Sequence, residues 1–393
     1  MIILAIETSC DETAVSIVRA TGDFPHARYE VLGHTLFSQM DLHREYGGVF
    51  PSLAKREHAK TVVPMLEQAL EEARLTETPH ELTAETRHTI AQTLAREPGL
   101  TEALSTFLTT HGRPPIDRIA VTAGPGLEPA LWVGINFAKA LALAWDVPLI
   151  PVDHMEGHIF ISIFNGERLA PLSFPALALF ISGGHTELIA MHGWSEYTLI
   201  GRTRDDAVGE AFDKVARMLD LPYPGGPEIS RLAEEARTAC IEPTLSLPRP
   251  MLTSSDTDFS FSGLKTAVRH ALMNRELTDE YRREVALDFE NAVTEVLVAK
   301  TRRALEELDA QSLIIGGGVA ANRHIRRAFT ELFTTEYPER TLYLPEPSLT
   351  TDNALMIALV GHARATSGGA DLATVAAYGN KRQEGVWRTP ASG

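Results

Sequence analysis

The stretch MIILAIETSCDETAVSIV, residues 1–18, contains two apolar runs separated by a polar turn. The runs, Ile2 to Ile6 and Ala14 to Val18, have the length and aliphatic composition of β-strands. The residues between them, Glu7 to Thr13, are rich in hydroxyl and carboxyl side chains. The pattern predicts a β-hairpin whose turn can hold a phosphate or a carboxylate. Taken alone, however, the stretch is better explained as an ordinary polar hairpin.

The same pattern occurs a second time in FPALALFISGGHTELIAMHG, residues 174–193. Strands are expected at Ala176 to Ile181 and at Leu188 to Met191, joined by a turn that contains Gly183 and Gly184. Paired glycines let backbone N–H groups approach an anion closely. Two hairpins of one design in a single chain suggest an internal duplication.

A third glycine-rich turn lies in SLIIGGGVAANRHIRRAF, residues 312–329. A strand at Leu313 to Ile315 runs into three glycines and then into an expected helix carrying Asn322. A strand, a glycine turn and a helix N-terminus together favour nucleotide binding, because the helix dipole and free N–H groups attract anions. The spacing is not G-x-G-x-x-G, which argues against a dinucleotide-binding Rossmann site. The tract DLPYPGGPEI, residues 220–229, is expected to be a rigid loop.

Length and composition indicate a globular protein of more than one domain. The chain has 393 residues, of which 44% are hydrophobic and 22% charged. No apolar run reaches the roughly 18 to 20 residues of a membrane span, and the start has no basic region typical of a signal peptide. Its two cysteines, Cys10 and Cys240, suit a reducing compartment. We therefore expect a cytoplasmic protein, and its net charge of −16 argues against non-specific binding to a polyanion.

The stretch PVDHMEGHIF, residues 151–160, spaces His154 and His158 four positions apart. On a helix these positions share one face, so two imidazoles there can bind one metal ion. On this stretch alone, the metal site and ordinary packing are about equally plausible. The peptidase pattern H-E-x-x-H is not met, because Met155 occupies the position of the catalytic acid and Glu156 lies about 100° further round the helix.

A third metal ligand is suggested by Asp352, which precedes an expected amphipathic helix in PSLTTDNALMIALVGHA. Carboxylates join imidazoles in many zinc and iron sites. The alternative is that Asp352 only caps that helix, and local sequence favours this alternative.

Nine motifs occur in an order that resembles one protein family. They are ETSCDET (7–13), GPGL (124–127), HMEGH (154–158), SGGHTEL (182–188), GEAFDK (209–214), YPGGP (223–227), FSFSGLKTA (259–267), GGGVAAN (316–322) and TDNALMIA (351–358). Together they closely resemble the TsaD family of tRNA N6-adenosine threonylcarbamoyltransferases. Each motif alone is weak, but the ordered set covers almost the whole chain.

The resemblance implies an α/β, actin-like fold of two ribonuclease-H-like lobes with an interlobe cleft. Residues 1–160 would form the N-terminal lobe, with a helical insertion at about 76–113, and 161–350 the C-terminal lobe. Residues 351–393 would be a C-terminal helix that packs back on the N-terminal lobe. By position in the motifs, His154, His158 and Asp352 become the metal ligands. The positions matching adenylate-binding residues are Phe180, Ile181, Ser182, Gly183, Gly184, Asp213, Gly226 and Asn322.

The reaction that the resemblance implies moves threonylcarbamoyl from threonylcarbamoyl-adenylate to the adenosine beside the anticodon and releases AMP. One divalent metal, iron or zinc, is expected per chain, and ATP is a second candidate nucleotide. Asp11 or Glu12 is expected to accept the amine proton. The implied partners are tRNA and TsaB-like and TsaE-like proteins, with no membrane.

Two features depart from the family pattern. The segment at about 76–113 is longer than the usual connection. Lys55-Arg56 stands where Ser-Arg is common, and with Arg323, Arg326 and Arg327 it is a candidate basic surface for tRNA. Two other functions stay open: an ATP-dependent small-molecule kinase on the same fold, which needs no histidine pair, and a non-catalytic scaffold, which would be expected to lose the metal ligands.

Overall fold

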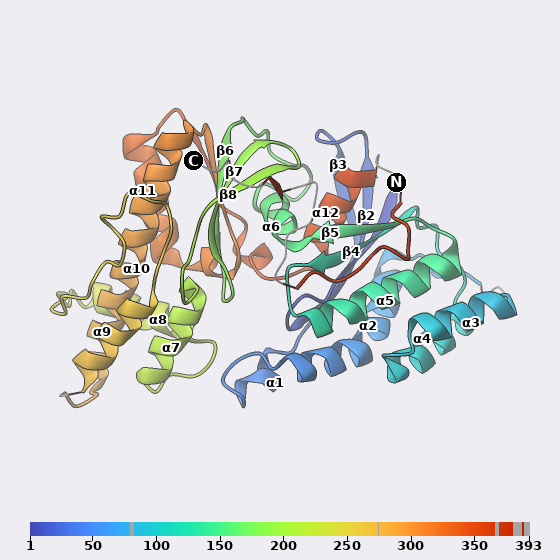
Figure 1. Cartoon of the computed structure of the whole chain (residues 1–393), viewed down its shortest axis with the longest axis horizontal. Helices are drawn as coiled ribbons and strands as arrows, with labels where there is room; N and C mark the ends of the chain where they lie inside the picture. Colours follow the sequence, from blue (N-terminus) through green and yellow to red (C-terminus); the bar gives the residue numbers. More distant parts are fainter. Residues whose placement is uncertain (79–81, 274, 366–368, 380–386, 389–393) are drawn as a thin grey trace. The chain divides into compact units, whose positions relative to one another are not determined.

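The computed structural model describes residues 1–393 except 79–81, 274, 366–368, 380–386 and 389–393 (Figure 1). The chain forms two compact units, Met1–Ala170 with Asp352–Gln383, and Pro171–Thr351 with Glu384–Gly393. Each unit has its own sheet and its own hydrophobic core. Parts of the segments 76–113 and 351–393 lie outside the described residues.

The first unit contains a five-stranded mixed sheet in the order β3-β2-β1-β4-β5. Its first two strands are the predicted hairpin, in which Ile6 lies opposite Val15 in antiparallel register, while β4 and β5 continue the sheet in parallel. The strands are β1 (Ile2–Glu7), β2 (Glu12–Thr21), β3 (Arg28–Ser38), β4 (Arg118–Gly124) and β5 (Leu149–Asp153). The hairpin prediction is therefore confirmed, with strands that extend further than the apolar runs.

Helices cover both faces of this sheet (Figure 1). Leu4 and Ile6 face the core formed with α2 and α5, whereas Ile3 and the other alternate positions face α12. On that face the helix packs so closely that a Cβ added to Gly361 would lie 2.7 Å from Cβ of Ala120. The helices are α1 (Met40–Arg44), α2 (Pro51–Ala73), α3 (Ala84–Thr93), α4 (Pro98–Thr110), α5 (Glu128–Trp145), α6 (His154–Ser162) and α12 (Ala354–Arg364).

The segment from about 76 to 113 contains α3 and α4, which pack against α5 and α2. Leu94, Leu100, Leu104 and Leu108 are all buried there. The pair therefore joins the core of the first unit through the outer side of the α2 and α5 layer.

The second unit repeats the arrangement of the first. Its sheet has the order β10-β9-β6-β7-β8-β11. The β6 and β7 hairpin is antiparallel, as is β7 with β8, and β9 and β10 are parallel to β6. The strands are β6 (Ala176–Ile181), β7 (Thr186–Gly193), β8 (Glu196–Arg202), β9 (Ser312–Gly316), β10 (Thr341–Tyr343) and β11 (Trp387–Arg388).

The core of the second unit lies between its sheet and its longer helices. The helices are α7 (Val208–Met218), α8 (Gly225–Thr238), α9 (Ser262–Leu272), α10 (Asp279–Leu308) and α11 (Arg323–Glu336), with the 3-10 turns η1 (Gly318–Ala321) and η2 (Pro347–Leu349). The expected rigid loop at 220–229 is wrong in its second half, because α8 already begins at Gly225. Pro227 is tolerated in the first helical turn, where backbone N–H groups have no helical acceptor.

The two sheets share five strands of one topology: a three-stranded antiparallel meander whose first strand is followed by two parallel strands. In the second sheet, β11 adds a further strand parallel to β8. This is the ribonuclease-H-like pattern, and its duplication confirms the predicted actin-like fold class. Among the described helices, none is both long enough and apolar enough to cross a membrane.

Candidate metal centre and nucleotide-binding residues

The start of α6 places two imidazoles side by side in the first unit. Asp153 caps the helix, since its Oδ1 accepts hydrogen bonds from the N–H groups of Met155 (3.0 Å) and Glu156 (3.3 Å). His154 and His158 follow on one helical face, with ring centroids 4.7 Å apart and planes at 86°. Both residues are buried. The predicted helical spacing of the pair is therefore present.

Asp352 lies directly before α12 but does not cap it. The N-cap is Asn353, whose side chain accepts the N–H of Met356 at 3.1 Å. The carboxylate of Asp352 turns to the histidines instead, with Oδ1 2.9 Å from Nε2 of His158 and 3.5 Å from Nε2 of His154. The capping explanation of Asp352 is therefore wrong, because its neighbour performs that role.

The donor atoms of these three side chains fit one metal ion. All three lie within 4.8 Å of one another, and the two Nε2 atoms are 3.2 Å apart. Ligands about 2.1 Å from a metal, at angles between octahedral and tetrahedral values, are separated by about 3.0 to 3.4 Å. The observed separations of 2.9, 3.2 and 3.5 Å lie within about 0.1 Å of that range. Two imidazoles and a carboxylate suit either zinc or iron.

The electrostatics of the cluster favour a cation. Burial lowers the pKa of His154, but the carboxylates of Asp352 and Glu7 outweigh burial and raise that pKa to about 9. Burial lowers the pKa of His158, although its hydrogen bond with Asp352 acts in the opposite direction. The cluster therefore attracts one positive charge to its centre, and a divalent ion can replace the proton of His154.

Glu7, at the end of β1, holds the far side of His154. Its fully buried carboxylate lies 3.2 Å from Nδ1 of His154 and accepts hydrogen bonds from the N–H of Ser9 and the hydroxyl of Thr122, both at 2.5 Å. A carboxylate on Nδ1 places the ring proton there and leaves Nε2 with a lone pair for a metal. Sequence reasoning missed this residue. The available signal was an acid that ends an apolar strand, where a buried charge requires partners.

Glu156, between the two histidines, has a structural partner. Its side chain is fully buried and forms an ion pair with Arg364 at the end of α12. This carboxylate is engaged with a cation on another helix, which agrees with the rejection of a peptidase site.

The first turn of the chain places Asp11 and Glu12 at the start of β2. The backbone carbonyl of Asp11 accepts the N–H of Gln39 at 2.9 Å, and the Ser38 hydroxyl donates to Glu12 Oε1 at 3.4 Å. Burial, followed by the charges of Asp11 and Asp352, raises the pKa of Glu12 well above its ordinary value. A carboxyl group with a raised pKa is suited to accept a proton near neutral pH.

The second unit contains the predicted phosphate-side residues at the end of β6. Phe180 and Ile181 are buried in the strand, and the Ser182 hydroxyl accepts the N–H groups of Gly184 (3.3 Å) and His185 (3.1 Å). Gly183 and Gly184 face open space, since a Cβ on either would contact nothing within 4 Å. Their exposed backbone is accessible to a phosphate.

Helix α7 brings Asp213 and the start of α8 together. Oδ1 of Asp213 accepts the N–H of Gly225 at 2.7 Å. Burial raises the pKa of Asp213, while hydrogen bonds from Gly225 and Gly226 act against that rise. A Cβ on Gly225 would lie 2.4 Å from Ala216, so only glycine permits the two helices to approach so closely. Gly226 faces open space beside this contact.

Asn322 is the N-cap of α11 rather than its first helical residue. Its Oδ1 accepts the N–H groups of His324 and Ile325, both at 3.0 Å, and its Nδ2 donates to Glu290 at 2.7 Å. The neighbouring Phe289 packs edge-on against Phe212, which precedes Asp213 on α7. Helix α10 therefore links Asn322 to the Asp213 region, but most of the amide's hydrogen-bonding capacity is used within the protein.

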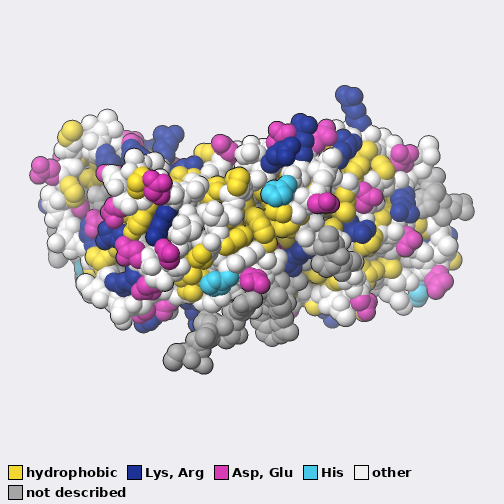
Figure 2. Space-filling view, turned by 90° about the horizontal axis from the view of Figure 1, so that it is seen from above, with side chains coloured by type: hydrophobic (Ala, Val, Ile, Leu, Met, Phe, Trp, Pro, Cys, Tyr) yellow, Lys and Arg dark blue, Asp and Glu magenta, His cyan; other side chains and the backbone are white. Residues whose placement is uncertain are grey.

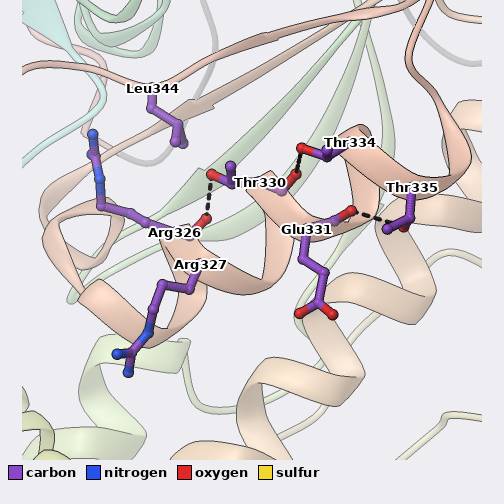
Figure 3. A pocket seen from close by; sticks show the side chains of 7 residues that line it. All are labelled: Arg326, Arg327, Thr330, Glu331, Thr334, Thr335 and Leu344. Atoms are coloured by element: carbon purple, nitrogen blue, oxygen red, sulfur yellow. Dashed lines mark hydrogen bonds between the residues drawn. The ribbon is translucent and has the colours of Figure 1, made fainter.

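Three of the predicted basic side chains are engaged within the protein. Arg326 donates to the carbonyls of Ala320 and Pro345, and Arg327 forms a two-point ion pair with Glu234 at 2.9 and 2.6 Å. Both line an open groove along α11, where they extend to different sides of the helix (Figure 3). Lys55 lies 3.2 Å from Glu97. On the face seen in Figure 2, Lys and Arg are interspersed with Asp and Glu.

The threonines of this groove, Thr330, Thr334 and Thr335, donate to carbonyls of their own helix at 2.7 to 2.8 Å (Figure 3). The groove therefore presents few free polar groups to a ligand.

Comparison with known sequences gives one consistent result. A family model described as "TsaD: tRNA N6-adenosine threonylcarbamoyltransferase" matches residues 30–110 and 100–359. A protein of that name from Geobacillus kaustophilus is 43% identical over 361 residues, 91% of this chain and 90% of the relative. One from Anaeromyxobacter sp. is 43% identical over 376 residues, 95% and 98% of the two chains. Among solved structures, HypF from T. kodakarensis aligns at 13% identity and a TM-score of 0.47, over 69% of this chain and 43% of that one.

Proposed function

The chain belongs to the TsaD family of tRNA N6-adenosine threonylcarbamoyltransferases, and we propose that it transfers threonylcarbamoyl from threonylcarbamoyl-adenylate to tRNA. The acceptor is the N6 amine of the adenosine next to the anticodon in tRNAs that read codons beginning with A. The products are threonylcarbamoyladenosine and AMP. The residue assignment rests on one observation, the convergence of His154, His158 and Asp352 in a chain that matches this family.

The chemistry sets three requirements. The N6 nitrogen attacks the carbamoyl carbon, the bond from that carbon to the phosphate oxygen breaks with its electron pair going to AMP, and one proton leaves N6. An aromatic amine is a weak nucleophile, so the carbonyl must be polarised and the proton accepted. The leaving phosphate must be stabilised as its charge develops.

His154, His158 and Asp352 would hold one divalent ion, iron or zinc, which would supply Lewis acidity toward the threonylcarbamoyl part. Glu7 contributes by fixing the orientation of the His154 ring. Of the two candidate bases, the raised pKa of Glu12 favours Glu12 over Asp11 as the group that accepts the N6 proton.

In the second unit, the open backbone at Gly183 and Gly184 would bind the phosphate of the adenylate. Phe180, Ile181 and Ser182 shape the strand end that presents this turn. The adenosine would bind near Asp213, Gly226 and Asn322, and ATP is a second candidate nucleotide there. Two observations support these three residues. They match the family motifs, and contacts of α7 with α8 and with α10 link them to one another.

We include TsaB-like and TsaE-like partners in the proposal. A chain of net charge −16, in which the candidate arginines Arg326 and Arg327 are engaged internally, has a weak electrostatic attraction for tRNA. Partner proteins would compensate for that weakness. The proposal places the reaction in the cytoplasm, where tRNA is used.

Mass spectrometry of tRNA nucleosides tests the activity. Depletion of this protein should remove threonylcarbamoyladenosine, and expression of the wild type should restore it. His154→Ala, expressed to the same level, should not restore it. Unchanged threonylcarbamoyladenosine after depletion would contradict the proposed function.

A further inference from the structure

The GPGL turn, residues 124–127, joins β4 to α5 and lies against the first turn of the chain. The N–H of Leu127 donates to the carbonyl of Ser9 at 2.7 Å. A Cβ added to Gly126 would lie 2.6 Å from that carbonyl oxygen and 2.8 Å from Cβ of Ser9. Glycine is therefore required for so close an approach, and a larger residue would have to displace the backbone of Ser9.

Ser9 in turn supports a proposed metal ligand. Its side chain is buried, and its Oγ lies 3.3 Å from Nδ1 of His154. Its N–H donates to Oε1 of Glu7 at 2.5 Å, and Oε2 of the same carboxylate lies 3.2 Å from the same Nδ1. Two acceptors on Nδ1 fix the rotation of the imidazole and therefore the direction of the Nε2 lone pair. Displacement of Ser9 would turn that lone pair away from a metal.

The other side of the GPGL turn contacts the segment that follows α12, which runs beside β4 (Figure 1). The N–H of Gly126 donates to the carbonyl of Gly379, and the N–H of Tyr378 donates to the carbonyl of Ala123, both at 2.9 Å. A Cβ on Gly124 would lie 2.5 Å from the carbonyl oxygen of Tyr378 and 2.8 Å from its ring. The turn is thus held between this segment and the first turn of the chain.

The segment has a separate attachment to the hydrophobic core. Val375 is buried and belongs to the core of the first unit. Tyr378 and Gly379, by contrast, contact the GPGL turn through backbone groups and the aromatic ring. Anchoring of the segment and contact with the turn therefore depend on different residues, which substitutions can separate.

We propose that Tyr378 and Gly379 are positioning residues for the metal ligand His154, acting through the GPGL turn and Ser9. This inference rests on the proposed function, because it concerns the metal centre of that function. Each link is a backbone hydrogen bond, a close glycine contact or a side-chain contact with the imidazole. Close-packed atoms pass on a displacement because little free volume is left to absorb it. A change in the C-terminal segment should therefore alter metal affinity.

The first experiment substitutes the glycine that touches Ser9. Gly126→Ala should weaken Zn²⁺ binding about tenfold, because the added Cβ displaces Ser9 and with it the His154 ring. Competition with a chromophoric chelator measures the Kd, and the visible absorption of bound Co²⁺ should change with the ligand geometry. Gly99→Ala is the matched control in the same unit, because its Cβ would meet none of the described residues within 4 Å. It should leave both readouts at wild-type values.

The second experiment substitutes the C-terminal segment itself. Tyr378→Ala should weaken Zn²⁺ binding about threefold to tenfold, because the turn loses the ring beside Gly124. Tyr378→Phe keeps the ring and should keep the Kd. Val375→Ala is the control for stability: it should lower the free energy of unfolding in urea, because buried methyl groups are lost, but leave the Kd and the Co²⁺ spectrum unchanged.

The outcomes separate this inference from the proposed function. Wild-type Kd and Co²⁺ spectrum in folded Gly126→Ala and Tyr378→Ala would overturn the inference and leave the function intact. A Val375→Ala protein that lost as much metal affinity as Tyr378→Ala would overturn it too, because affinity would then follow stability alone. A wild type that bound metal with this dependence but transferred no threonylcarbamoyl to tRNA would refute the proposed reaction and support the positioning role.

Discussion

The ammonium group of Lys55 lies 3.2 Å from Oε1 of Glu97, whose side chain is almost completely buried. Lys55 is on α2, and Glu97 immediately precedes α4 in the segment from about 76 to 113. Asn136 of α5 donates to the other carboxylate oxygen at 3.3 Å. The two departures from the family pattern, the long segment and the lysine, are thus in direct contact. The ion pair with Glu97 thus engages the lysine with this segment.

This contact predicts a stability effect. Lys55→Ser should lower the free energy of unfolding by about 2 kcal/mol, because the buried Glu97 carboxylate would lose its ion-pair partner while its hydrogen bond from Asn136 remains. Urea unfolding measures the change. Lys60→Ser is the control, since Lys60 pairs with Glu57 on the surface of the same helix and should cost less than about 1 kcal/mol.

A double-mutant cycle isolates the pair. Glu97→Gln in the Lys55→Ser background should recover part of the loss, because the uncompensated charge is gone. Strictly additive effects of the two substitutions would show that Lys55 and Glu97 do not stabilise each other.

The second prediction concerns Glu7 and metal affinity. Glu7→Gln replaces the carboxylate beside Nδ1 of His154 by a neutral amide of the same size. Metal binding should weaken by about 10- to 100-fold. Competition with a chromophoric zinc chelator measures the Kd. Thr122→Val, which removes one hydrogen bond to Glu7 but leaves its charge, should have a smaller effect.

His154→Ala should cause the largest loss of metal affinity among these variants, because it removes a ligand. Its fold should persist, and urea unfolding checks this. A Glu7→Gln protein with the wild-type Kd would show that the carboxylate does not support His154.

The strands could be predicted from the sequence, whereas the contacts that complete the sites could not. The β1 and β6 strands were predictable because their apolar runs are bounded by turns, and this local signal survives in the fold. The helix at Gly225 was missed because prolines and glycines normally indicate a loop, and the tertiary contact with Asp213 overrides that preference.

Long-range contacts explain the remaining gaps. Glu7 and His154 are brought together by the pairing of strands, and no spacing rule connects them. The same holds for Lys55 and Glu97. For Asp352, the local sequence favours a helix cap. In the structure Asn353 caps α12, and the carboxylate of Asp352 lies against His158 instead.

The third prediction is a pH dependence of stability. His58 is fully buried, and burial lowers its pKa to about 4. Its Nε2 donates to the carbonyl of Cys10 at 3.0 Å and its Nδ1 accepts from the Thr13 hydroxyl at 2.7 Å. In the unfolded chain its pKa returns to about 6.5, so between these values the unfolded state binds more protons. The free energy of unfolding should therefore fall by up to about 3 kcal/mol as pH drops from about 6.5 to about 4.

His58→Gln keeps a donor and an acceptor but does not titrate, so its unfolding free energy should fall less over the same pH range. The exposed His26, replaced by Gln, is the control and should leave the wild-type profile unchanged. Identical acid profiles of the wild type and His58→Gln would exclude His58 as the source.

The last prediction separates two roles of Asn322. Its amide oxygen caps α11 and one N–H donates to Glu290, which is fully buried and pairs with Arg237 at 2.6 Å. A second N–H remains for a nucleotide. In Asn322→Ser the hydroxyl preserves the cap, but the bond to Glu290 and any bond to the nucleotide are lost. We expect AMP affinity to fall about tenfold, or about 1 to 1.5 kcal/mol, and stability to fall by about 1 kcal/mol.

Glu290→Gln distinguishes the two losses, because its amide oxygen still accepts from Asn322 and it has no proposed contact with the nucleotide. This variant should show the stability cost, since it weakens the ion pair with Arg237, but keep its AMP affinity. Metal content should be unchanged in both variants, because the three ligands belong to the first unit. Calorimetry with AMP measures the affinities. If Asn322→Ser bound AMP as tightly as the wild type, Asn322 would be a structural cap and the adenosine would be held by other residues.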